Sequence, residues 1–263
     1  MEKTKRGQLT LFIIIAILIV AIILTLIFYV NPSLAPKTHD QRIAIFKTNF
    51  LECFEESYKH ALEVIGSQGG LITYPDFDYY DAGFYFYPYY YNKGESLLPE
   101  ITKIQEEIGK FSQVLAQDCL LRHTRRIEDY DFMIYKEIKV IPEIYYEKVL
   151  FKTELELTIL SENISYIIDF SDSEIIIPSK LKESYELAQI IIEQTKESDM
   201  EWIDLTLIST EAKKRGLNIS IINDEKKENV HLFTIKTNQI NYYPNEFNFM
   251  GKYNFYEIGF PGI

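Results

Sequence analysis

The sequence predicts an α+β fold in which an N-terminal transmembrane helix is followed by a helical pair and an antiparallel sheet with inserted helices. Three observations predict it. An apolar run over residues 8–30 contains no charged side chain, two segments near 40–65 and 99–121 carry apolar residues at helical spacing, and the chain after residue 131 alternates apolar with polar positions. Steps of three and four residues are typical of helices, whereas alternation is typical of half-buried strands.

The composition suits a globular protein with a sizeable core. Of its 263 residues 47% are hydrophobic, and 20 Tyr and 17 Phe supply large rings for burial. The formal net charge of −12 gives a surface that repels phosphate groups. Nucleic acid is therefore not expected as a partner.

Catalytic and metal-binding motifs are not evident. The four histidines lack the close spacing of a metal motif, and no phosphate loop, dinucleotide fingerprint or Gly-x-Ser-x-Gly elbow is present. We therefore expect no metal, no cofactor and no enzymatic activity. An extracytoplasmic hydrolase stays the third functional hypothesis, because an acid/base pair that converges across a fold cannot be recognised in a sequence.

The apolar run over residues 8–30 is long enough to span a bilayer, since roughly 20 apolar residues cover a hydrocarbon core of about 30 Å. Lys3, Lys5 and Arg6 precede the run, and this positive-inside bias predicts a cytoplasmic N-terminus with the bulk of the chain outside the cell. The expected domains are a leader (1–7), a single-pass helix in contact with membrane lipid (8–30) and a linker (31–39). A cleaved secretory signal peptide ending near Ala35 is the alternative.

The leader Lys5-Arg6-Gly7-Gln8, followed directly by the apolar run, resembles the class III signal peptide of archaeal type IV pilin-like surface proteins. The resemblance implies cleavage between Gly7 and Gln8, and self-assembly or assembly with other pilin-like subunits. The chain departs from that family at Thr10-Leu11, where a Ser-Pro pair often occurs. It also departs at Pro32 and Pro36, which end the first helix. A plain, uncleaved anchor is the alternative.

The next region, residues 40–130, is expected to be helical and braced by a disulfide. One helix runs from about 40 to 65 and ends at Gly66, and a second runs from Pro99 to about 121. Each carries one of the only two cysteines, Cys53 and Cys119, which are the natural disulfide pair of an exported domain. Two buried free thiols are the alternative.

Between these helices lies a Tyr-rich segment over residues 74–91. Pro75, Gly83 and Pro88 exclude a regular helix and predict a loop or an irregular strand. The rings either contact a surface protein or a glycan, or they fold back into the core. The candidate binding residues are Tyr79, Tyr80, Tyr85, Tyr87, Tyr89, Tyr90 and Tyr91.

Three aspartates of this segment, at positions 76, 78 and 81, are either ordinary loop acids or ligands of a Ca²⁺ ion. The order of a Cys-bearing helix, Gly69-Gly70-Leu71-Ile72, a Tyr-rich loop and a second Cys-bearing helix resembles a group of uncharacterised, membrane-anchored archaeal proteins. That resemblance implies an extracytoplasmic location and no known activity.

Residues 131–263 are expected to form an α+β region. The clearest strand covers residues 149–159, with flanking strands near 137–141 and 164–170. Helices near 179–194 and 201–215 and strands near 217–222, 230–236 and 253–260 complete the chain. Asn163 and Asn218 begin glycosylation sequons.

The function that we expect from these patterns is that of a membrane-anchored, pilin-like extracytoplasmic surface protein with a structural or assembly role. The alternative is an anchored receptor or adhesin that binds a protein or a glycan through its Tyr-rich loop.

Overall fold

The computed structural model describes residues 14–25, 39–124, 131–134, 137–161, 164–197, 203–224 and 229–253 of the chain. These residues form an α+β fold of helices and several sheets. The chain divides into two compact units, Met1–Phe46 and Lys47–Ile263. The second unit contains the disulfide, the sheets and every candidate site described below.

The N-terminal part of the predicted fold class requires correction. In the first unit, residues 14–25 are helical. A hydrocarbon core is about 30 Å thick, and none of the helices in the described ranges combines the length and apolar character needed to cross a membrane. The prediction depended on the whole run 8–30, of which residues 8–13 and 26–30 lie outside the described ranges. The predicted transmembrane helix is therefore wrong for the part of the chain that the structure describes.

The two predicted extracytoplasmic helices are present as α2 (His39–Ser67) and α3 (Ile101–Thr124). Within α2 the buried rings Phe50, Phe54 and Tyr58 recur every four residues, as expected for a helix that buries one stripe. Cys53 of α2 and Cys119 of α3 form a disulfide with a Cα–Cα distance of 6.2 Å, which confirms the predicted bridge.

In the part of the chain that the structure describes, three separate sheets replace the single predicted one. Two are small and antiparallel, with the strand orders β5-β6-β9 and β4-β7-β8. Their strands are β4 (Asp131–Ile134), β5 (Lys139–Tyr145), β6 (Lys148–Glu154), β7 (Glu156–Ser161), β8 (Ile164–Asp169) and β9 (Glu174–Pro178).

The predicted strand 149–159 is in fact two strands. The chain leaves β6 at Glu154 and enters β7 at Glu156, so its two halves belong to different sheets. Every second residue from Val149 to Ile159 is nevertheless buried, Leu155 included. The apolar alternation therefore continues unbroken across the junction, and the pattern carried no sign of the change of sheet.

The third sheet has the order β1-β2-β12-β11-β10, with β3 paired to β2. Its strands are β1 (Tyr79–Asp81), β2 (Phe86–Asn92), β3 (Glu95–Ser96), β10 (Leu217–Asn223), β11 (Val230–Thr237) and β12 (Glu246–Lys252). The pairing of β12 with β2 is parallel, with Met250 opposite Tyr89, whereas the other pairings are antiparallel. The predicted wholly antiparallel sheet is corrected at this point as well.

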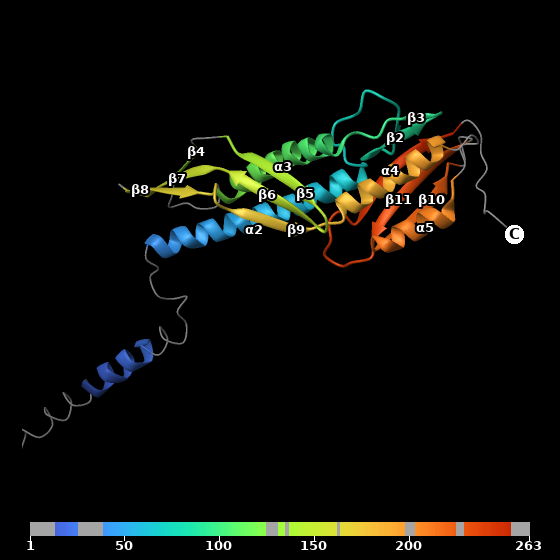
Figure 1. The fold of residues 1–263 in the computed structure, drawn as a ribbon. Coiled ribbons are helices and arrows are strands. Elements are labelled where there is room, and N and C mark those ends of the chain that lie inside the picture. The colour runs from blue at the N-terminus through green and yellow to red at the C-terminus, as the bar shows by residue number, and fades with distance from the viewer. Residues whose placement is uncertain are drawn as a thin grey trace, which may run out of the picture. The chain divides into compact units, whose positions relative to one another are not determined.

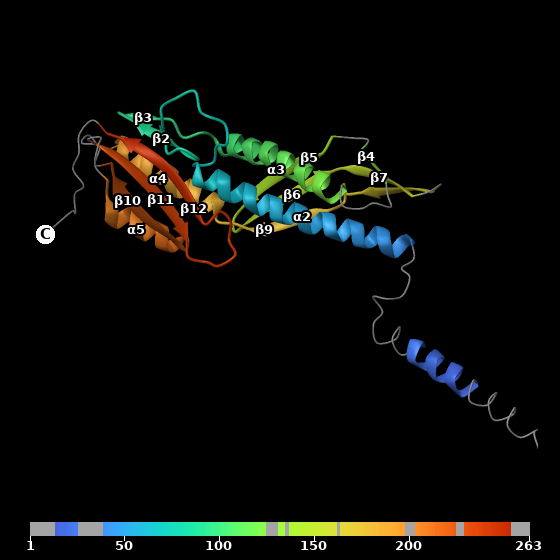
Figure 2. The same cartoon turned by 180° about the vertical axis from the view of Figure 1, so that it is seen from behind.

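Two helices, α4 (Leu181–Glu197) and α5 (Leu205–Lys214), lie against one face of the third sheet (Figures 1 and 2). They correspond to the predicted helices 179–194 and 201–215. Asp204 caps α5 by accepting hydrogen bonds from the backbone N–H groups of Thr206 and Leu207.

The last strand of the sheet was not predicted. β12 covers Glu246–Lys252, whereas the expected strand 253–260 lies, except for Tyr253, outside the described residues. A signal for β12 is present in the sequence, because Phe247 and Phe249 alternate with polar residues shortly after Pro244.

Candidate functional site

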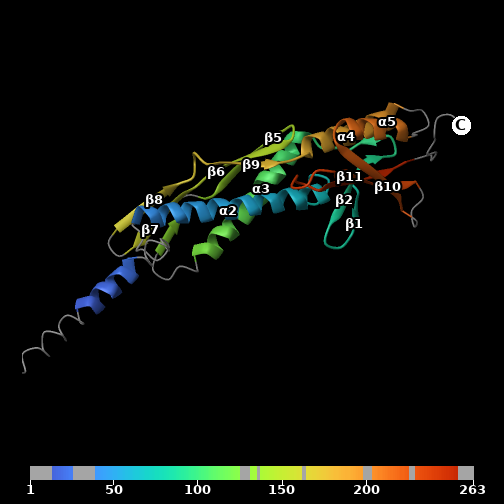
Figure 3. The same ribbon diagram turned by 90° about the horizontal axis from the view of Figure 1, so that it is seen from below.

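The Tyr-rich segment, for which the sequence predicted a loop or an irregular strand, forms a β-hairpin. Tyr80 pairs with Tyr87, and Asp81 pairs with Phe86. The turn is closed by a hydrogen bond of 2.9 Å from Ala82 N to Tyr85 O. We call residues 74–92 the aromatic hairpin; its strands carry the labels β1 and β2 in Figure 3.

The turn is held by two further features. Gly83 N donates to Asp81 Oδ1 at 2.8 Å, and Gly83 has φ of +91°, a conformation that suits glycine. The residue that follows, Phe84, is thereby placed at the tip of the hairpin. Sequence reasoning did not select Phe84; a glycine in a turn directly before an aromatic residue is the signal that could have found it.

The rings of the aromatic hairpin divide into three groups. Phe86, Tyr89, Tyr90 and Tyr91 are buried. Phe77, Tyr80 and Tyr87 are half-buried, and the rings of Tyr80 and Tyr87 stack at 6.3 Å. The exposed rings are Tyr74 (58%), Tyr79 (40%), Phe84 (99%) and Tyr85 (44%). Of the seven candidate binding tyrosines, only Tyr79 and Tyr85 thus lie exposed at the surface, while three are part of the core.

Two of the exposed rings are fixed by packing. Tyr74 and Tyr79 lie 5.1 Å apart between ring centroids, and each contacts the buried Phe86, at 4.9 and 5.8 Å respectively. Aromatic pairs at such distances are mutually stabilising. These rings therefore hold one position at the surface before any ligand arrives.

A buried carboxylate anchors the start of the hairpin to α3. Glu107 Oε2 accepts hydrogen bonds from Ile72 N (3.3 Å), Thr73 N (3.1 Å) and Thr73 Oγ1 (2.8 Å). Burial by itself raises the pKa of Glu107, but these hydrogen bonds and the nearby Lys103 ammonium outweigh it and hold the pKa below its ordinary value. The charged carboxylate thus fixes the point at which the chain leaves α2 for the hairpin.

Two hollows border the aromatic hairpin. One of about 370 Å³ is lined by Tyr74 and Asp76 together with Lys103 and Lys110 of α3. The other, of about 190 Å³, is lined by Tyr80, Tyr87, Ile222, Asn223, Asp224, Leu232 and Met250. Because Leu232 is the register partner of both Ile222 and Met250, this second hollow crosses the sheet at right angles to its strands.

The aromatic hairpin is also acidic. It contains Asp76, Asp78 and Asp81, all exposed, and no Lys, Arg or His. The three carboxylates do not converge on one point: in the described residues the only trio with metal-ligand atoms within 4.8 Å of one another is Cys53, Cys119 and His123. The geometry therefore gives no support to a Ca²⁺ site here.

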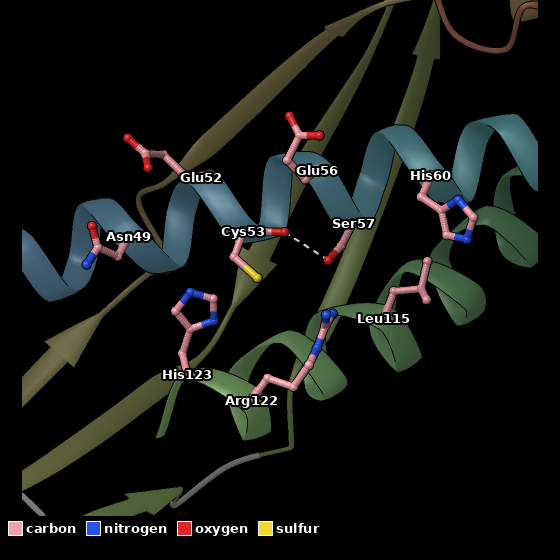
Figure 4. Close-up of a pocket in the computed structure, with 9 residues that line it drawn as sticks. All are labelled: Asn49, Glu52, Cys53, Glu56, Ser57, His60, Leu115, Arg122 and His123. Carbon is pink, nitrogen blue, oxygen red and sulfur yellow. Dashed lines mark hydrogen bonds between the residues drawn. The ribbon is translucent and has the colours of Figure 1, made fainter. Parts of the chain in front are cut away.

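A second candidate site is the pocket of about 590 Å³ between α2 and α3, which lies beside the disulfide (Figure 4). His123 Nδ1 lies 3.1 Å from Cys119 O, and its ring packs against Phe50 at 5.9 Å. The two cysteine sulfurs are bonded to each other in the disulfide, so neither is a thiolate, the form in which cysteine ligates a metal. His123 is thus the one member of this trio still able to ligate a metal.

The pocket also places a hydroxyl near these groups. Ser57 Oγ donates to the backbone oxygen of Cys53 at 2.8 Å (Figure 4), which directs its proton to a carbonyl and not to an imidazole. Arg122 pairs with Asp118 at 2.9 Å on its own helix. The pocket therefore lacks the nucleophile–base contact that hydrolysis by a serine requires.

The remaining predicted residues are placed as follows. Asn218 is exposed on β10, the edge strand of its sheet, and its Nδ2 donates to Asn238 Oδ1. Asn163 lies outside the described residues, so glycosylation stays a prediction at both sequons.

The predicted processing residues Gly7 and Gln8 also lie outside the described ranges. The resemblance to archaeal pilin-like proteins, which depends on those residues and the run after them, stays a prediction. In comparisons with known proteins, no family model, curated protein or solved structure matches the chain.

Proposed function

We propose that this chain is an exported binding protein that holds a partner against its aromatic hairpin outside the cytoplasm. The observation that carries the proposal is the exposure of four rings, those of Tyr74, Tyr79, Phe84 and Tyr85, on a hairpin in which Phe86, Tyr89, Tyr90 and Tyr91 are buried in the core. The proposal concerns binding, not catalysis.

Exposed rings of this kind favour a binding role for two reasons. Complete burial of a Phe side chain is worth about 1.5–3 kcal/mol, and Phe84 is almost fully exposed. Rings fixed before binding lose little conformational entropy on contact, and the packing of Tyr74 and Tyr79 on Phe86 provides that fixation. Aromatic residues are accordingly enriched among the residues that dominate binding interfaces.

The location outside the cytoplasm is supported by the disulfide between Cys53 and Cys119. Structural disulfides form and persist in oxidising compartments and are rare in the cytosol.

The proposal is tested by binding of the fluorescently labelled full chain to cell-envelope preparations from the organism that produces it. In one variant Phe84→Ser and Tyr85→Ser are combined. The control is Ile240→Ser, which removes a side chain that is 88% exposed on the loop between β11 and β12. We expect the double variant to bind about tenfold or more weakly, because each lost ring contact of this kind costs more than about 1 kcal/mol.

Thermal unfolding accompanies each binding curve. We expect all three proteins to unfold at nearly the same temperature, since the substituted side chains are exposed. Equal binding by the wild type and the Phe84→Ser, Tyr85→Ser variant would refute the proposed function.

A further inference from the structure

The charge around the exposed rings restricts the chemistry of the partner. Asp76, Asp78 and Asp81 are exposed on the same hairpin as the exposed rings, and residues 74–92 contain no basic side chain. We infer that the aromatic hairpin binds a segment of a partner protein rich in Lys and Arg. This inference rests on the proposed function and names the chemistry of its partner.

Rings and carboxylates on one surface suit a cation for separate reasons. The face of an aromatic ring carries negative electrostatic potential and attracts an ammonium or guanidinium group within about 6 Å of its centroid. This chain already uses such contacts elsewhere, with Lys182 Nζ 4.1 Å from the ring centroid of Tyr146. A Lys or Arg side chain that lies over Phe84 would reach Asp81 of the same turn and form a charge-assisted hydrogen bond.

Two of the three carboxylates of the hairpin are held in position by hydrogen bonds. Asp81 Oδ1 accepts from Gly83 N at 2.8 Å, and Asp78 Oδ2 accepts from Asn92 Nδ2 at 3.4 Å. These contacts fix the negative charges relative to the rings before a partner arrives. A fixed charge contributes more to specificity than a mobile one, because less side-chain entropy is lost on binding.

Two basic groups next to the hairpin are already paired with a carboxylate. Lys103 and Lys110 line the hollow next to Asp76, but both pair with Glu107 of α3, at 3.5 and 3.7 Å. The chain as a whole carries a formal charge of −12, which attracts a basic partner from a distance and repels an acidic one. A wholly apolar partner would have to desolvate three carboxylates without compensation.

The test measures binding of the full chain to oligo-lysine and oligo-arginine peptides by fluorescence anisotropy. The same lysine peptide with every Nε acetylated is the uncharged control. We expect binding of the charged peptides that weakens steeply with salt, and no measurable binding of the acetylated one. Equal binding of the charged and acetylated peptides would overturn the inference.

Two variants separate local recognition from general attraction. In the first, Asp76→Asn, Asp78→Asn and Asp81→Asn are combined; Asn keeps an acceptor oxygen for Gly83 N. In the second, Asp172→Asn, Glu174→Gln and Glu197→Gln remove three exposed charges elsewhere. We expect the first to weaken peptide binding about tenfold or more and the second less than about twofold. Equal effects would show general attraction and overturn the inference.

Phe84→Leu tests the ring itself, since leucine keeps an apolar side chain without a π face. We expect peptide binding to fall several-fold, as loss of a cation–π contact predicts, and unchanged binding would contradict the role of the ring.

The envelope assay separates the proposed function from this inference. If the triple Asn variant binds envelopes normally while the Phe84→Ser, Tyr85→Ser variant does not, the hairpin binds an uncharged partner: the proposed function stands and this inference fails.

Discussion

Replacement of Glu107 by Gln tests how the aromatic hairpin is anchored. The Glu107 side chain is only 2% exposed, and one of its oxygens accepts three hydrogen bonds from Ile72 and Thr73. Gln keeps the shape and one acceptor oxygen but removes the charge. Hydrogen bonds to charged groups contribute about 1.5–3 kcal/mol and neutral ones about 0.5–1.5 kcal/mol. With about 1 kcal/mol lost for each of three bonds, and some relaxation, we expect Glu107→Gln to lower the free energy of unfolding by about 2–3 kcal/mol.

The measurement is urea unfolding at neutral pH, with amide hydrogen exchange to locate the effect. Glu106→Gln is the matched control, because the neighbouring Glu106 side chain is 64% exposed and lies 3.9 Å from Lys103. We expect that control to change stability by less than about 0.5 kcal/mol. Faster exchange should be confined to the amides of Ile72 and Thr73 and to the chain that follows them.

The pH dependence gives a second check on the same reasoning. The pKa of Glu107 lies below its ordinary value of 4.5, because the hydrogen bonds from Thr73 and Ile72 overcome the opposing effect of burial. A lowered carboxyl pKa contributes stability that is fully present above the unfolded pKa and is lost as the pH falls through the folded pKa. The difference between wild type and Glu107→Gln should therefore be constant above about pH 5.5 and shrink progressively below about pH 4.5. A difference that does not change down to strongly acidic pH would refute this explanation.

Two further substitutions test the fold around the hairpin. Cys53→Ala and Cys119→Ala together remove the disulfide, which joins residues 66 positions apart. We expect the free energy of unfolding to fall by about 4 kcal/mol in the chain-entropy account. A melting temperature equal to that of the wild type would contradict a bracing role. Gly69→Ala should destabilise by more than about 1 kcal/mol, because Gly69 has φ of +67° and an added Cβ would lie 2.5 Å from Asn248 O. Its control is Gly83→Ala at φ of +91°, where an added Cβ meets no atom within 4 Å; we expect thermal unfolding to show the smaller loss there, and equal losses would show that strain alone, without the clash, sets the cost.

Local patterns in the sequence were sufficient for the helices. Phe46, Phe50 and Phe54 recur about one helical turn apart, so their spacing predicts α2 without knowledge of any other element. The disulfide could be predicted because the chain has only two cysteines and therefore one possible pairing. Each of these inferences depends on a few neighbouring residues or on simple counting.

The apolar run over 8–30 shows where local patterns mislead. Its composition satisfied the rule for a membrane span, yet no helix in the described residues has both the length and the apolar character needed to cross a membrane. Similarly, the alternation from Val149 to Ile159 predicted one strand, because both β6 and β7 bury the same side of the chain. The periodicity of a sequence shows which face of a strand is buried, but it does not show to which sheet the strand belongs.

The division of the aromatic hairpin between core and surface was decided by the tertiary structure alone. Tyr89 is buried because β2 pairs in parallel with β12, whose residues lie about 160 positions later in the chain. Phe84 is exposed because the turn carries it beyond both strands. The sequence by itself determined that this segment is aromatic, acidic and unable to form a helix. Which rings are available to a partner depends on a pairing between distant strands, and such a pairing leaves no periodic signal in either strand.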